Sequence, residues 1–203
     1  YSFASDPEFG KAREPFLRCV NFARAFNASA PAGFYALDSF TLDHLQEPLK
    51  SPSVFNFYLP TYSPPGPITE AERTAPEFQI LNATTMHTGP NYFWNAILGG
   101  LHRWGTGTSS HAVRLNLVPE MALNVPPGTD PNEPVPNVIP LDPDPLIRRM
   151  DLALTGGTLS PENHRIIREA LLRVGSPTWE WPKQRLRLAI YLIVSSPEFN
   201  VIR

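Results

Sequence analysis

Residues 144–174 read DPLIRRMDLALTGGTLSPENHRIIREALLRV, and this stretch decides the fold class of the chain. Asp144 precedes Pro145, the arrangement of a capping residue followed by a proline in the first helical turn, where a missing N–H costs nothing. We therefore expect a helix over 146–154. The pair Gly156-Gly157 predicts its end, because glycine adopts the left-handed backbone that closes many helices.

The second half of the stretch repeats this signature. Ser160 is placed to cap a helix that Pro161 opens and that runs to about Val174. Beyond the stretch, Pro182 opens another helix, which ends near Ser196-Pro197. Together the segments predict a helical hairpin followed by a third helix, packed as a small α-bundle.

Proline is the most unusual feature of the composition. The chain has 24 prolines in 203 residues, whereas about 5% is usual. Disorder is excluded because 12 Phe, 6 Tyr and 4 Trp can build a core, and collagen because 12 Gly cannot fill every third position. A long coiled coil is excluded because proline interrupts helices too often. The sequence therefore describes a globular protein.

Charge and cysteine content exclude further classes. The chain has 17 basic and 19 acidic residues, a net charge of −2, and so lacks the strongly basic character of nucleic-acid-binding proteins. Cys19 is the only cysteine, so neither an internal disulfide nor a thiolate zinc site can form. The longest apolar run, Leu188 to Val194, is about a third of a membrane span. We expect no nucleic-acid partner and no transmembrane segment.

Helical signals also occur in the first half of the chain. Pro15 suits the first turn of a helix over 13–27, in which apolar residues recur at helical spacing. A weaker pattern predicts a second helix over 37–46. Between 113 and 117 apolar and polar residues alternate, which predicts a short strand or an extended edge.

Two consecutive T-x-x-E patterns predict capping boxes, at Thr69 with Glu72 and at Thr74 with Glu77. After the second box we expect a helix over about 77–86. A further helix over 91–98 should stop at Gly99-Gly100.

These patterns predict a mainly α fold, an irregular helical bundle with long proline-rich connections and at most a short strand pair. We divide the chain into a helical region 1–118, which includes the proline-rich aromatic segment 48–67, a proline-rich connection 119–145, and the C-terminal helices 146–203. The three parts are expected to form one compact domain that is a fragment of a longer protein.

Aromatic residues gather in the 48–67 segment and provide the main candidates for binding. The favoured interpretation is that Phe55 and Phe57 fill the helical core while Tyr58 and Tyr62 pack against prolines. The alternative is that these rings stack on a sugar or a partner peptide. With His102, Trp104 and His111 from the loop 102–111, the full set of binding candidates is Phe55, Phe57, Tyr58, Tyr62, Trp104, His102 and His111.

No catalytic motif is present in the sequence. The histidines form no metalloprotease pattern, and no nucleophile elbow occurs. Cys19 lies near the apolar face of the first helix, where a buried small hydrophobe is the expected role. Helix capping accounts for Asp144, and a loop or an exposed helical face accounts for Asp142 and Asp151. We therefore assign no catalytic residue, no metal ligand and no cofactor.

Several phrases together resemble one bacterial family, the domain of unknown function 1800. They are GKAREP (10–15), RAF (24–26), PSVFNF (52–57), YSPPG (62–66), APEFQI (75–80), YL (191–192) and SPEF (196–199). The resemblance implies a mostly helical, exported protein located in the periplasm, at the cell surface or outside the cell. It also implies that this chain corresponds to the C-terminal part of the family, downstream of the family's conserved polar phrases.

The function expected from these observations is structural. The chain should dock on the remainder of its own precursor or on another exported protein, with Arg13 bound to a carboxylate at the start of its helix. One alternative is a subunit of a secreted enzyme acting on a polymer or cell-surface substrate, to which His102 or His111 contributes. Another is a carbohydrate-binding surface component. Tyr1 is read as a cleavage product of a longer protein or as an arbitrary boundary.

Overall fold

The computed structural model describes residues 10–33, 35, 43–101, 112–130, 141–174 and 180–202. Over these residues the chain is mainly α-helical, as the sequence predicts, and the sheet they form is a two-stranded antiparallel pair. The elements follow in the order β1 (Lys11–Ala12), α1 (Pro15–Ala25), α3 (Pro67–Glu70), the 3-10 helix η2 (Pro76–Gln79), α4 (Ala83–Gly99), α5 (Val118–Ala122), α6 (Asp144–Thr155), α7 (Pro161–Arg173), α8 (Trp181–Val194), α9 (Pro197–Asn200) and β2 (Val201–Ile202).

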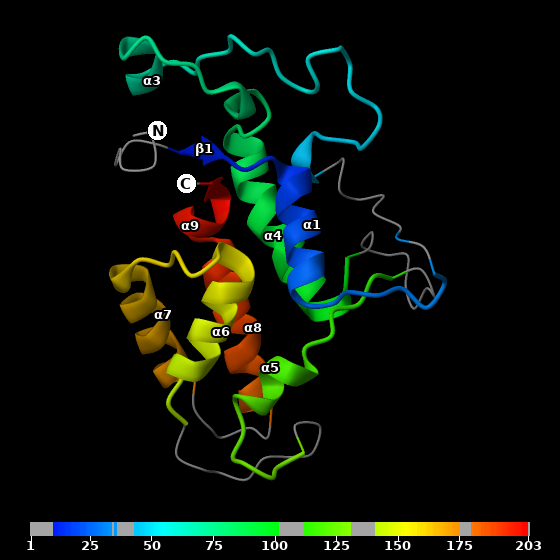
Figure 1. Cartoon of the computed structure of the whole chain (residues 1–203), viewed down its shortest axis with the longest axis vertical. Helices are drawn as coiled ribbons and strands as arrows, with labels where there is room; N and C mark the ends of the chain where they lie inside the picture. Colours follow the sequence, from blue (N-terminus) through cyan, green and yellow to red (C-terminus); the bar gives the residue numbers. More distant parts are fainter. Residues whose placement is uncertain are drawn as a thin grey trace.

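Helix α8 is the centre of the packing. It contacts α4, α5, α6 and α7, and Figure 1 shows α6 and α7 beside it and α4 continuing to the opposite end of the molecule. Leu186, Ala189, Ile190 and Ile193 are fully buried at the spacing of one helical face. They belong to a core cluster that also contains residues of α1, α4, α6, α7 and α9. The 48–67 segment and α3 lie together at one end of the molecule (Figure 1). The core around α8 is therefore to one side of this segment.

The predicted hairpin of α6 and α7 is confirmed. Gly156 closes α6 in the left-handed conformation with a φ of 74°, and the Ser160 hydroxyl accepts a hydrogen bond from the Asn163 N–H at the start of α7. The prediction that Asp144 caps α6 is wrong, because Asp144 is the first helical residue. Its N–H donates to Oδ1 of Asp142, which stands two residues earlier.

Helix α4 corrects the prediction of two helices over 77–86 and 91–98. It is one helix that continues through Pro90, although Pro90 has no N–H to give to the preceding turn. Residues on both sides of Pro90 are buried, among them Thr85, Gly89 and Phe93. Tertiary packing of this face outweighs the lost hydrogen bond, and the region before it forms only the short η2.

The capping boxes predicted at Thr69 with Glu72 and at Thr74 with Glu77 are also wrong. Neither α3 nor η2 has a side-chain hydrogen bond to its N-cap position. The box lies instead at α4, where the Asn82 side chain accepts from the N–H groups of Thr84 and Thr85, and the Thr85 hydroxyl accepts from the Asn82 N–H. The T-x-x-E pattern does not detect this capping box, because Asn82 and Thr85 stand in place of the Thr and the Glu and form the same two hydrogen bonds.

The strand pair joins residues that are far apart in the sequence. Lys11 pairs with Ile202 and Ala12 with Val201. The edge predicted over 113–117 makes single bridges, from Leu101 to Val113 and from Ser29 to Arg114. Of the helix predicted over 37–46, Asp43 and His44 are helical, and residues 36–42 lie outside the described part.

The connection 119–145 is less irregular than predicted where the structure describes it, because α5 begins at Val118. Its Glu120 is buried and forms an ion pair with Nε of Arg149 at 3.2 Å, which fixes α5 against α6. Residues 131–140 lie outside the described part. In the ranges that the structure covers, no helix is both long enough and apolar enough to cross a membrane.

Helix α9 is tied to the start of α7 by Glu198. Its carboxylate accepts from the Ser160 N–H at 3.0 Å and from the Asn163 amide at 2.8 and 2.9 Å. Burial acts to raise the pKa of Glu198, but the hydrogen bonds from Ser160 and Asn163 outweigh it and lower the pKa to about 2. The carboxylate therefore stabilises the fold in its charged form.

This pKa shift predicts a specific acid dependence. Because the pKa of Glu198 is lower in the folded state than in the unfolded state, its stabilisation is complete above about pH 4.5 and is lost as the pH falls towards 2. In urea unfolding at several pH values, Glu198→Gln should be less stable than wild type at pH 7, and the difference should shrink below pH 4.5. Glu169→Gln, which removes an exposed carboxylate of α7, is the control. A difference that does not vary with pH would contradict this assignment.

Candidate functional site

The 48–67 segment is held by polar side chains that converge on Glu14, at the start of α1. Oε2 of Glu14 accepts from Nε2 of Gln46 at 2.7 Å and from Nδ2 of Asn56 at 3.4 Å. Gln46 is buried, and its Oε1 accepts from the Phe16 N–H at 2.8 Å. Because the first N–H groups of a helix lack partners within the helix, Gln46 caps α1 from a distance in sequence.

We call these hydrogen bonds around Glu14 the anchor of the segment, and two further contacts extend it. The Tyr58 hydroxyl is hydrogen-bonded to Glu14, and burial, this bond and the charges of Glu14 and Glu77 all raise the pKa of Tyr58. The hydroxyl therefore stays protonated. The Leu59 N–H donates to Oε1 of Gln79 in η2 at 2.8 Å. The side chains of Asn56 and Tyr58 and the Leu59 N–H are thus bound to α1 and η2.

Beside the anchor, β1 is joined to η2 by an ion pair. Nζ of Lys11 lies 2.9 Å from Oε1 of Glu77, whose side chain is buried. The hydrogen bond to Glu77 and its negative charge raise the pKa of Lys11. Three of the phrases that carry the family resemblance, 10–15, 52–57 and 75–80, therefore meet at one end of the molecule.

The apolar side chains of the segment point outward. The exposed fractions are 104% for Leu49, 93% for Val54, 53% for Phe55 and 51% for Leu59. The interpretation that Phe55 fills the helical core is therefore wrong, and Phe57 is half-buried outside the core cluster. The physical reason is that Glu14 and Gln79 bind the polar groups of the segment, which turns its apolar groups to the solvent. These four exposed apolar residues, which we call the exposed patch, lie within eleven positions of the chain, and such a concentration is typical of interaction surfaces.

The backbone of this patch is strained. Leu49 has a φ of 65° and Asn56 a φ of 68°, both in the left-handed region. Asn accepts this conformation readily, but a left-handed leucine costs about 1–2 kcal/mol. Leu49 gains no burial in return, since it is fully exposed. Strain of this kind is typical of positions where another constraint fixes the backbone.

The remaining predicted site residues divide into two groups. Tyr62 is half-buried, and its carbonyl accepts from the Ala75 N–H at 2.9 Å. His102, Trp104 and His111 lie outside the described residues. Phe55, Phe57, Tyr58 and Tyr62 are therefore the candidates that the structure describes, and Phe55 is the exposed one among them.

The structure agrees with the expected role of Cys19 and differs from that of Arg13. The Cys19 thiol is buried, as predicted, and lies 3.7 Å from the Tyr92 hydroxyl. Burial raises its pKa to about 11, which keeps it protonated and unreactive. Arg13 does not have the expected carboxylate among the described residues; its guanidinium lies 5.4 Å from the centre of the Phe199 ring.

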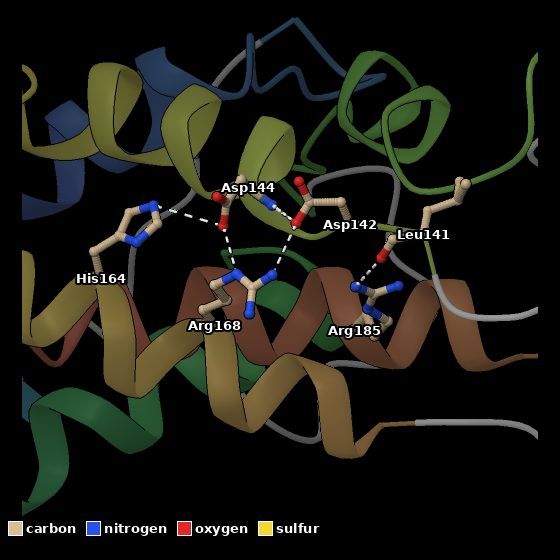
Figure 2. Close-up of polar contacts among 6 residues, drawn as sticks. All are labelled: Leu141, Asp142, Asp144, His164, Arg168 and Arg185. Carbon is tan, nitrogen blue, oxygen red and sulfur yellow. Dashed lines mark hydrogen bonds and ion pairs between the residues drawn. The ribbon is translucent and has the colours of Figure 1, made fainter.

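A second charged cluster joins α6, α7 and α8 (Figure 2). Nε of Arg168 lies 3.1 Å from Oδ1 of Asp144, and its Nη2 lies 3.5 Å from Oδ1 of Asp142. Nε2 of His164 is 4.0 Å from the same Asp144 oxygen. The buried Arg185 donates to the Leu141 carbonyl at 2.8 Å.

The geometry of this cluster indicates a structural role. Its contacts hold the start of α6 against α7 and α8. Over the described ranges, no group of three acidic, histidine or cysteine side chains is placed to hold a metal ion. The sequence could not reveal the pairs, because Asp144 and Arg168 are 24 residues apart.

The family model described as a protein of unknown function, DUF1800, matches residues 2–201. The chain belongs to the DUF1800 family. No curated protein and no solved structure matches this DUF1800 protein. The family has no assigned function, so a function is argued from the polar anchor and the exposed patch. Both involve residues 45–62, the 45–62 region, which contains Gln46 and most of the 48–67 segment.

The anchor makes a prediction for Glu14. Glu14→Ala should leave the donors of Gln46, Asn56 and Tyr58 without their acceptor and cost about 1–3 kcal/mol. Hydrogen exchange measured by mass spectrometry should become faster over 54–59. Glu47→Ala, which removes an exposed carboxylate paired with Lys50, should change neither quantity. Equal exchange in both variants would show that Glu14 does not hold the segment.

Proposed function

We propose that this DUF1800 protein is an exported bacterial protein whose C-terminal helical part docks, through the outward side of the 45–62 region, on a protein partner. The partner would be the remainder of its own precursor or another exported protein. The observation that carries the proposal is the inverted orientation of the segment, with Asn56 and Tyr58 bound to Glu14 and the apolar side chains in water.

The energetics support a protein rather than a small polar ligand. A patch of Leu49, Val54, Phe55 and Leu59 gains free energy when apolar surface covers it, at about 25 cal/mol per Å². The strained left-handed Leu49 holds an aliphatic side chain away from the protein at a cost. Burial of the same side chain against an aliphatic surface of a second polypeptide would offset the strain energy.

The alternatives have less support. Sugar binding needs an open tyrosine platform, whereas Tyr58 is half-buried and its hydroxyl is committed to Glu14. The enzyme alternative depends on His102 and His111, which lie outside the described residues. The docking proposal uses only groups that the structure describes.

Site-specific photo-crosslinking in the producing cells tests the proposal. A crosslinking residue introduced at Leu59 should form an adduct with one defined polypeptide, identified by mass spectrometry. Leu49→Asp and Val54→Asp should each reduce the yield about tenfold or more, because they place a charge in an apolar interface. Circular dichroism should show unchanged folding, because both side chains are exposed.

The matched control uses Ile166, an exposed apolar residue of α7. Ile166→Asp should leave the Leu59 adduct unchanged, and a crosslinker at Ile166 should not give that adduct. An adduct that persists in Leu49→Asp and Val54→Asp, or the absence of any adduct at Leu59, would overturn the proposal.

A further inference from the structure

Two arginines at the start of the chain lie together on α9. The Arg13 N–H donates to the Asn200 carbonyl at 2.8 Å, and its guanidinium covers the Phe199 ring. Nη1 of Arg18 donates to Oδ1 of Asn200 at 2.5 Å. The two guanidinium groups therefore lie on neighbouring residues of α9, that of Arg13 on Phe199 and that of Arg18 on Asn200.

These guanidinium groups are poorly compensated. Nη1 of Arg13, and Nε and Nη2 of Arg18, are buried and make no hydrogen bond. Arg18 is only 6% exposed, and burial together with the charge of Arg13 lowers its pKa to about 10. A desolvated charge is costly without a counter-charge, and the described residues supply none, so the pair creates a site of positive potential.

The acidic residues that the structure describes next to the pair in sequence and on α9, Glu14 and Glu198, are bound elsewhere. Glu14 accepts from Gln46 and Asn56, and Glu198 accepts from Ser160 and Asn163. Among the described residues, no ion pair joins either arginine to a carboxylate.

A groove gives access to Arg13. It is lined by Arg13, Leu17 and Asn21 on one side, by 152–156 on the other, and by Ile202, with a volume of about 480 Å³. This volume is within the range of small-molecule sites. Leu17, Leu152 and Ile202 are all exposed large apolar residues, and all three line this groove. The side chain of Arg13 thus lines the groove together with three exposed apolar side chains.

We propose that this groove binds a small amphiphilic anion, with a carboxylate or phosphate group on the Arg13 guanidinium and an alkyl body against Leu17, Leu152 and Ile202. Arg18 supplies a second positive charge from behind. The ligand class follows from the pairing of one cation with apolar walls, because a wholly polar anion would leave the walls exposed and a neutral alkane would leave the charge uncompensated. None of the residues that line this groove belongs to the docking segment.

Isothermal titration of the purified chain with octanoate and octyl phosphate tests the proposal. Both should bind more tightly than acetate, inorganic phosphate or octanol. Arg13→Gln should weaken octanoate binding about tenfold or more, because it removes a charged hydrogen-bond donor. Leu17→Gln should reduce the preference for octanoate over acetate.

The controls separate this site from general attraction to basic protein. Arg24→Gln changes an exposed arginine at the other end of α1 and should leave octanoate binding unchanged. The proposal fails if octanoate does not bind, or if Arg24→Gln weakens it as much as Arg13→Gln. It also fails if octanoate binds only after Asp6→Asn or Glu8→Gln, since the chain would then supply the anion itself.

Discussion

The carboxylate of Glu14 decides which side of the 48–67 segment faces the protein. It accepts from Gln46, Asn56 and Tyr58, which come from two different stretches of chain. A proline-rich segment has few backbone hydrogen bonds of its own, so side-chain acceptors fix its orientation. Because these polar groups are bound towards the protein, the side chains of Leu49 and Val54 face the solvent and do not reach the core.

In the helical bundle the orientation of polar and apolar side chains is the reverse of that in the 48–67 segment. Around α8 the apolar side chains point inward at helical spacing, and charged groups such as Arg168 and Asp144 lie at the edges of the bundle. The bundle therefore supplies the stability that an inverted segment cannot supply for itself. Arg13 and Arg18, which have no carboxylate partner among the described residues, contact α9 at Phe199 and Asn200.

The sequence predicted what depends on neighbours along the chain. Ser160 and Gly156 mark helix ends by local backbone chemistry, so the α6–α7 hairpin could be read directly. Long-range effects could not be read. Packing carries α4 through Pro90, and Phe55 faces outward because Asn56 bonds to Glu14, 42 residues away. The phrases that carry the family resemblance contain residues of the anchor, but only the structure shows that phrases far apart in the sequence are in contact.

The central claim is that the outward side of the 45–62 region is covered in the assembled protein. Hydroxyl-radical footprinting of the isolated chain and of the protein in the cells that produce it tests this directly. Oxidation of Leu49, Val54 and Phe55 should be fast in the isolated chain and strongly reduced in the cells, while exposed Ile166 reacts equally in both. Equal oxidation of Leu49, Val54 and Phe55 in the two states would contradict the account.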